Sequence, residues 1–213
     1  MATRRSGRHP YHHGDLRRAL LREADAVLRA EGAGALSLRE VARRAGVSPA
    51  APYAHFPDKE ALLAALAAEG FRRLTRDLRA AFKGAAHDPL RRLKAMTAEY
   101  VRFAVTHPAY LRLMFGAERP AIERYPDLHE VAHEAAGVIL TAIVDCQQAG
   151  QIEAGDPMER ALFVWVVIHG LAELLLSGMM PLAPGRAPAQ VEGARLAEAF
   201  VRRAMVGLAP RRR

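Results

Sequence analysis

Two histidines and a glutamate form the first grouping whose residue types and spacing suggest chemistry. His129, Glu130 and His133 match the H-E-x-x-H pattern, in which two histidines one helical turn apart bind zinc and the glutamate acts as general base. Glu153 follows and is a candidate third ligand. The glycine and third histidine of the extended pattern are missing. A zinc-dependent hydrolase therefore stays an alternative, while the main expectation is a protein that is not an enzyme and holds no cofactor.

Other chemically active groupings are scarce. Cys146 is the only cysteine, so no intramolecular disulfide can form, and a single helical cysteine is usually a small buried apolar residue. The first residues carry charges but no apolar run, so no signal peptide is predicted and a cytoplasmic location is expected. The apolar stretch 161–176 contains His169 and Glu173 and is shorter than the roughly 20 residues of a membrane span. It predicts a buried helix or an interface, and no membrane partner.

Composition indicates helices and a polyanionic partner. The 213 residues are 51% hydrophobic but only 6% aromatic, and Ala and Leu supply most of the apolar residues, which favours packed helices. We therefore expect an all-α protein. Residues 1–76 hold 14 Lys and Arg against 8 Asp and Glu, which gives +6 of the total net charge of +8. Nucleic acid is therefore the expected partner, ahead of an anionic membrane, the second polyanion considered from charge alone.

The N-terminal part is divided into three predicted helices. Residues 1–13 lack apolar periodicity and form a basic arm, after which Asp15 caps a helix that lasts until Gly32. Ser37 and Glu40 have capping-box spacing and begin a short helix that ends near Ala45.

A third helix is predicted directly after a glycine turn. Ser48 serves as its cap and Pro49 as its first residue, and it ends near Phe56. Two short helices joined by such a turn are typical of a helix-turn-helix, whose second helix can enter the major groove of DNA. Pro52 removes one hydrogen bond in the first turn of this helix, where the ring clash is smallest.

Longer helices are predicted for the rest of the chain. Asp58 caps a long helix, and about five more follow, which makes about nine in all. Residues 181–188 are predicted to be a loop and residues 211–213 a solvated tail. Helix boundaries are expected at Asp88-Pro89, His107-Pro108, Tyr125-Pro126, Gly150, Asp156-Pro157, Gly178 and Pro188.

The stretch from Ser37 to Leu63 resembles the TetR family of transcriptional regulators. The matching residues are Leu38, Val41, Ala42, the run Ala45-Gly46-Val47-Ser48, Tyr53, His55, Phe56 and Lys59. The resemblance implies a helix-turn-helix DNA-binding domain over 14–74, with the motif at 37–56. Residues expected at the DNA are Ser37, Arg39, Val47, Ser48, Pro49, Ala50, Ala51, Tyr53, Ala54, His55 and Lys59. By the resemblance, Ser37, Ser48, Tyr53, His55 and Lys59 would mostly touch phosphates.

Direct reading of bases is expected to be sparse. Ala50, Ala51 and Ala54 offer only apolar contact, for instance to a thymine methyl group. Specificity would then depend on DNA shape and on arginines of the arm that enter a minor groove. A disordered tail with nonspecific charge is an equally good interpretation of the arm.

Residues 75–213 resemble the ligand-binding and dimerisation region of the same family, in the subtype named for a Trp-His-Gly pattern. The resemblance rests on Trp165, followed by His169 and Gly170. Trp165 and His169 are four residues apart and therefore share one face of a helix. A small, apolar or amphipathic effector would contact Tyr100, Phe103, Met114, Phe115, Trp165 and His169. Core packing is the alternative role for each of these side chains.

The resemblance also implies a homodimer formed by the last two long helices, 156–177 and 189–207. A two-fold dimer predicts a near-palindromic double-stranded operator, with recognition helices about 34–36 Å apart. The expected function is a DNA-binding transcriptional regulator, more specifically a repressor released by its effector. An architectural DNA binder without an effector is a further alternative.

Overall fold

The computed structural model describes residues 13–85, 87–179, 193, 195–200 and 203. Every regular element in these ranges is a helix, which confirms the all-α prediction. The last predicted helix is described only at positions 193, 195–200 and 203, all of them helical. The arm before His13, the loop 181–188 and the tail 211–213 lie outside the described residues.

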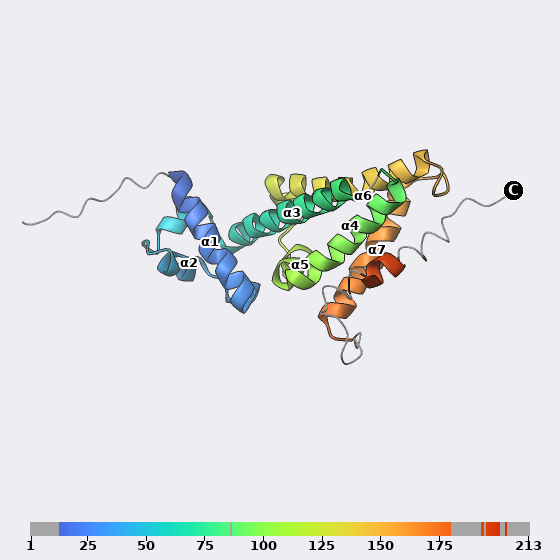
Figure 1. Cartoon of the computed structure of the whole chain (residues 1–213). Coiled ribbons are helices and arrows are strands. Elements are labelled where there is room, and N and C mark those ends of the chain that lie inside the picture. Colours follow the sequence, from blue (N-terminus) through green and yellow to red (C-terminus); the bar gives the residue numbers. More distant parts are fainter. Residues whose placement is uncertain (1–12, 86, 180–192, 194, 201–202, 204–213) are drawn as a thin grey trace, which may run out of the picture.

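The helices follow one another along the chain with short connections (Figure 1). Their bounds are α1 His13–Glu31, η1 Ala33–Ala35, α2 Leu38–Arg44, η2 Ala51–Ala54, α3 Lys59–Gly84, α4 Pro89–Thr106, α5 Pro108–Phe115, η3 Ile122–Arg124, α6 Pro126–Gln148 and α7 Pro157–Leu176, where η denotes a 3₁₀-helix.

Most predicted helix ends are confirmed, and the capping side chains explain them. The carboxylate of Asp58 accepts a hydrogen bond from the Ala61 amide at 2.8 Å, and Asp88 and Asp156 cap α4 and α7 in the same manner. Helix α1 is an exception, because it begins at His13 and so contains Asp15 instead of starting after it. The first turn of a helix accommodates an acidic residue inside it as well as before it, because the N-terminal end of the helix dipole is positive.

The N-terminal head consists of α1, α2, η2 and the first turns of α3 (Figure 1). Leu20 and Leu28 of α1 are fully buried, as are Val41 of α2 and Leu62 of α3. These residues recur on one face of each helix, so the three faces close a small apolar core. That core holds the short second and third helical segments against α1.

Helix α3 belongs to both halves of the molecule. Its 26 residues leave the head and continue between α6 and α4, so position 74, the expected domain boundary, lies in the middle of an unbroken helix (Figure 1). The body is completed by α5 and α7, and one apolar cluster runs from Leu20 in the head to Ile168 in α7. Cys146 is fully buried in this cluster, and burial raises the pKa of its thiol to about 11.

Helix α7 lacks a polar face. Ala161, Val164 and Ile168 are buried against the body, whereas several large apolar side chains point to solvent. The exposed ones are Met158, Leu162, Phe163, Val166 and Leu174. Among the described residues, no helix combines the length and the apolar character needed to cross a membrane.

Candidate functional site

The segment between α2 and α3 is the expected DNA-reading element, and its backbone differs from the prediction. The expected α-helix over 48–56 is wrong: residues 49 and 50 form a turn, and the helical part is the 3₁₀-helix η2, Ala51–Ala54. The residue that precedes η2 is Ala50, so Ser48 and Pro49 are not its cap and first residue.

Pro52 supplies the physical reason for the tighter helix. An α-helix would need the residue-52 amide to donate to the Ser48 carbonyl, and proline has no amide hydrogen. The Ser48 carbonyl instead accepts from the Ala51 amide at 3.0 Å, which is the spacing of a 3₁₀-helix. The Pro52 ring is buried, and its carbonyl accepts from the amides of His55 and Phe56, both at 2.9 Å. Pro52 thereby anchors the segment to the head.

Most of the predicted DNA-contacting side chains lie at the surface. The phenol of Tyr53 is 50% exposed, on the outer side of η2. The exposed residues of the set are Ser37, Arg39, Ser48, Pro49, Ala50, Tyr53, Ala54 and Lys59, and the half-buried ones are Val47, Ala51 and His55. Residues 45–57 include no charged side chain, so this segment itself presents hydroxyl and apolar groups and no carboxylate that would repel phosphate.

Two members of the set also serve the head itself. The Nε2 atom of His55 is buried without a hydrogen-bond partner, so only the remainder of this ring can face a ligand of the outer surface. The ammonium of Lys59 donates to the carbonyl of Gly34 at 3.1 Å and so ties the start of α3 to the turn after α1.

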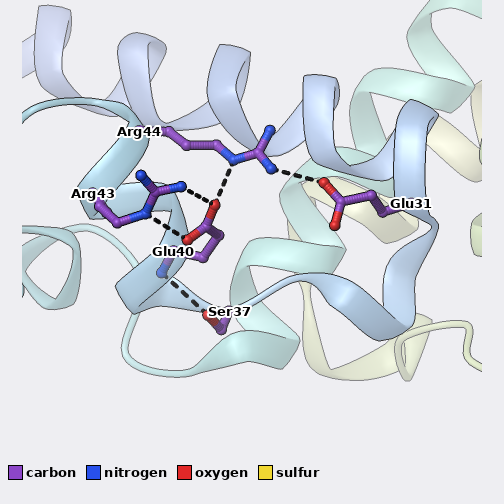
Figure 2. Close-up of polar contacts among 5 residues, drawn as sticks. All are labelled: Glu31, Ser37, Glu40, Arg43 and Arg44. Atoms are coloured by element: carbon purple, nitrogen blue, oxygen red, sulfur yellow. Dashed lines mark hydrogen bonds and ion pairs between the residues drawn. The ribbon is translucent and has the colours of Figure 1, made fainter.

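Charged side chains brace α2 on the side that faces α1 (Figure 2). Ser37 Oγ accepts from the Glu40 amide at 3.1 Å, which confirms half of the predicted capping box. The other half is wrong, because the Glu40 carboxylate accepts from Arg43 at 2.8 and 2.9 Å and from Arg44 at 2.7 Å instead of from the Ser37 amide. These hydrogen bonds lower the pKa of Glu40 to about 2. Arg44 also pairs with Glu31 of α1 at 2.7 Å.

Four of the six predicted effector residues meet in one aromatic cluster between α4, α5 and α7. We call Tyr100, Phe115, Trp165 and His169 the aromatic cluster. The Tyr100 hydroxyl lies 2.8 Å from His169 Nδ1, and the Trp165 ring stacks on His169 with centroids 5.2 Å apart. Phe115 meets the His169 ring edge-on at 5.1 Å. Burial raises the pKa of Tyr100 and lowers the pKa of His169, so burial favours the neutral form of both groups.

The other two predicted effector residues pack elsewhere. Phe103 packs against His107 with ring centroids 4.9 Å apart and the ring planes tilted by 56°, and Met114 lies under Gly70 of α3. A cavity of about 580 Å³ opens between the end of α1 and α5, and one of about 170 Å³ lies between the head and the start of α6. None of the six predicted effector residues lines either cavity.

The H-E-x-x-H residues lie on the exposed side of α6. His129 and His133 have Nε2 atoms 3.1 Å apart, but Glu153 is unsuitable as a third ligand. Glu153 comes after the end of α6. At a rise of about 1.5 Å per residue, that end of the helix is about 22 Å from His133 along the helix axis. Among the described residues, no group of three or more His, Cys, Asp or Glu is arranged to hold a metal ion.

A polar link between the head and the body escaped the sequence-based prediction. Asp25 of α1 is buried and accepts a hydrogen bond from the Tyr110 hydroxyl of α5 at 2.7 Å. Arg29 also pairs with this carboxylate, and Arg73 of α3 lies over the Tyr110 ring at 4.9 Å. Burial alone would raise the pKa of Asp25, but the hydrogen bonds outweigh it and hold this pKa below its ordinary value. No local pattern predicts a contact between residues 85 positions apart.

Comparisons with known proteins agree with this architecture. Residues 20–66 match the family described as bacterial regulatory proteins, tetR family, and residues 93–203 match the tetracyclin repressor-like, C-terminal domain. A Rhodococcus sp. RHA1 protein of unknown function is similar at 39% identity over 95% of this chain and 100% of its own, with a TM-score of 0.78.

Two further solved structures are similar over nearly their whole length. A bacterial regulatory protein in the tetR family from Rhodococcus RHA1 shares 25% identity over 91% of this chain and 97% of its own, with a TM-score of 0.65. A TetR family transcriptional regulator from Thermus thermophilus has the same fold at 17% identity, 86% and 97% coverage, and a TM-score of 0.63. The comparison with curated proteins gave no match.

Proposed function

Since the chain belongs to the TetR family of bacterial regulatory proteins and is a DNA-binding transcriptional regulator, we propose that it is a repressor released from its operator by a small-molecule effector. Proteins of this family bind DNA and dimerise. The proposal concerns which residues contact DNA, which surface dimerises and where the effector acts. The observation that best supports the proposal is the exposed surface of η2, which bears no charged side chain.

Tyr53 is the central DNA contact in this proposal. Its phenol is half exposed on η2 and is able to donate a hydrogen bond to a phosphate oxygen. Ser37 and Ser48 are exposed and present hydroxyl groups as expected phosphate contacts, and Lys59 adds charge. Such contacts position the head on the duplex without reading bases.

Base reading falls mainly to small side chains. Ala50 and Ala54 are exposed and allow close approach to the groove, where they can touch a thymine methyl group. Because η2 is only four residues long, the head presents few base contacts. Specificity then depends substantially on the shape and deformability of the operator.

The exposed apolar side of α7 supports a homodimer. Leu162 and Val166 are 54% and 56% exposed and lie one helical turn apart, and Phe200 of the following helix is also exposed. An apolar face of this extent on a helix whose other face is already buried favours a partner surface. A second copy of this chain offers the same surface across a two-fold axis.

The aromatic cluster is the proposed effector site. Trp165 and His169 belong to the Trp-His-Gly pattern and are half-buried, so a ligand can reach them without entering the centre of the body. Because burial favours the neutral forms of Tyr100 and His169, the site suits an apolar or amphipathic molecule with one hydrogen-bonding group.

Helix α3 connects this site to the head. It packs against α4 and α5, which carry Tyr100 and Phe115, and its first turns complete the head core. An effector that favours a body with differently spaced heads must weaken operator binding by the same factor by which the operator weakens effector binding.

Selection of bound duplexes from a random pool tests the DNA-binding part. The unaltered protein should select a near-palindromic motif at near-physiological salt. Tyr53→Ala should lose much of its affinity, and Tyr53→Phe, which keeps the ring without the hydroxyl, separates hydrogen bonding from packing. Binding that falls with salt equally on every sequence would refute the specific-regulator proposal.

Trp165 fluorescence tests the effector part, because Trp165 is the only tryptophan of the chain. A ligand that enters the aromatic cluster should change this emission and should release a bound operator over the same concentration range. His169→Ala should weaken both effects in parallel. An emission change without operator release would contradict the proposed coupling.

A further inference from the structure

The H-E-x-x-H residues have a geometry that the regulatory function does not use. His129 and His133 lie one turn apart on α6, both exposed, with ring centroids 4.3 Å apart and the two Nε2 atoms 3.1 Å apart. We propose that this histidine pair is a two-ligand site for a divalent transition-metal ion such as Zn²⁺, Ni²⁺ or Cu²⁺.

The distance between the two nitrogens fits chelation. With metal–nitrogen bonds of about 2.0–2.1 Å, a separation of 3.1 Å gives a nitrogen–metal–nitrogen angle of about 98°. This angle lies between those of octahedral and tetrahedral coordination, so both geometries are reached by small side-chain adjustments. Metal binding requires both rings to carry their hydrogen on Nδ1, which leaves an Nε2 lone pair on each.

Two of the neighbouring carboxylates are directed elsewhere. Asp127 pairs with Arg72 of α3, and Glu134 pairs with Arg79 of α3 at 2.7 Å, so these acids face α3 and not the histidines. Within the described residues no third ligand is placed to join the pair, so water completes the coordination. Two imidazole ligands favour Zn²⁺, Ni²⁺ and Cu²⁺ over Mg²⁺ and Ca²⁺, which prefer oxygen ligands.

Metal binding would stabilise the folded chain. In the unfolded state the two histidines are not held one helical turn apart, so an ion that needs both binds the native state more tightly and raises its stability. The site lies on the first turns of α6, beside η3, whose Arg124 pairs with Glu60 of α3 at 2.8 Å. The ion would therefore stabilise the first turns of α6, which lie close to the head.

Calorimetric titration of the full chain with ZnCl₂ tests the proposal. One ion should bind per chain, and His129→Ala or His133→Ala should each weaken this event by about 10- to 100-fold, because the second ligand no longer acts at a high effective concentration. Both side chains are exposed, so the variants should retain the circular dichroism of the unaltered chain.

Matched controls separate this pair from other histidines. His87→Ala removes an exposed histidine without a histidine partner one turn away, and its titration should equal that of the unaltered chain. Three further histidines stand near the N-terminus at positions 9, 12 and 13, and the variant lacking all three should keep the event. Zinc binding that persists in the His129/His133 double variant, or is lost with these three N-terminal histidines, would overturn the proposal.

Discussion

At the scale of single residues, burial of the Tyr100–His169 pair makes the stability of the folded chain depend on pH. The Tyr100 hydroxyl lies 2.8 Å from His169 Nδ1, and it donates to this nitrogen when the imidazole is neutral with its hydrogen on Nε2. Protonation of His169 would turn Nδ1 into a donor to the phenol oxygen and would place a charge among aromatic rings. Burial of the ring therefore favours the neutral imidazole.

The pH dependence of stability follows from the lowered pKa of His169. The unfolded chain binds the proton more readily, so the contribution of His169 is fully present above the ordinary histidine pKa of about 6.5 and is lost as the pH falls below it. Urea unfolding between pH 7.5 and 5 should show stability falling with pH, with a shallower slope for His169→Gln. His107, whose pKa burial also lowers, accounts for part of the remaining slope.

Tyr100→Phe is the matched comparison. It removes one hydrogen bond but no titrating group near neutral pH, so it should lower the free energy of unfolding by about 1 kcal/mol at pH 7.5 and keep most of the pH slope. Equal slopes for His169→Gln and the unaltered chain would show that the imidazole does not titrate in this coupled manner.

At the scale of elements, the close approach of α3 and α5 depends on Gly70. A Cβ atom at this position would lie 2.6 Å from Tyr110 Cδ1 and 2.7 Å from Met114 Sδ. Gly70→Ala gains up to about 1 kcal/mol of helix propensity but forces α5 away, at a cost of about 1–3 kcal/mol. Chemical denaturation should therefore show net destabilisation.

Gly137→Ala in α6 is the matched control for Gly70→Ala. Apart from the neighbouring backbone of α6 itself, no atom lies within 4 Å of an added Cβ there, so only the propensity gain applies and the free energy of unfolding should rise by up to about 1 kcal/mol. If Gly70→Ala raised the free energy of unfolding by a similar amount, α5 would have to move away from α3 without an energetic cost.

The link between α1 and α5 gives a second prediction at this scale. Tyr110→Phe leaves the buried Asp25 carboxylate without its 2.7 Å hydrogen bond and should destabilise the chain by about 1–3 kcal/mol. Hydrogen exchange of the α1 amides should rise more than that of α6, since the head loses a tie to the body. Tyr53→Phe, at an exposed tyrosine, should change neither quantity, and uniform exchange changes would contradict a local link.

Helix positions were predictable from the sequence because local signals determine them. Asp58, Asp88 and Asp156 mark helix starts by their capping chemistry, and four-residue spacing placed Trp165 beside His169. The prediction of an α-helix over 48–56 was wrong because Pro52 has no amide hydrogen. In so short a helix, the loss of this one hydrogen bond changes the whole element. Contacts between distant residues, such as Asp25 with Tyr110, depend on tertiary packing that no local pattern encodes.

At the scale of the whole molecule, α3 makes the head and the body one mechanical unit. A single apolar cluster extends from α1 to α7, and α3 crosses the expected boundary at position 74 as an unbroken helix (Figure 1). In the proposed mechanism, a displacement in the body would be passed to the head as a tilt of α3, because this helix is continuous between the two. In a two-fold dimer such a tilt changes the separation of the two heads, and this separation sets operator affinity.

The proposed dimer surface gives the last prediction. Leu162→Glu together with Val166→Glu adds two charges to the exposed apolar side of α7 while the buried side of the helix stays unchanged. Sedimentation of the variant at micromolar concentration should give a monomer, because burying unpaired charges in an interface costs several kcal/mol. Ala136→Glu, at an exposed position of α6, adds a charge outside this surface and should leave the dimer intact.

Operator binding should respond in step with assembly. A monomer presents one head, so the variant should bind the two half-sites of a palindromic duplex independently and lose the gain of about 10²-fold or more that comes from linking them. Extending the spacing between half-sites by five base pairs should weaken the unaltered protein and leave the monomeric variant unaffected, because half a helical turn places the second half-site on the opposite side of the duplex. Equal sensitivity of both proteins to this spacing would mean that α7 does not form the dimer interface.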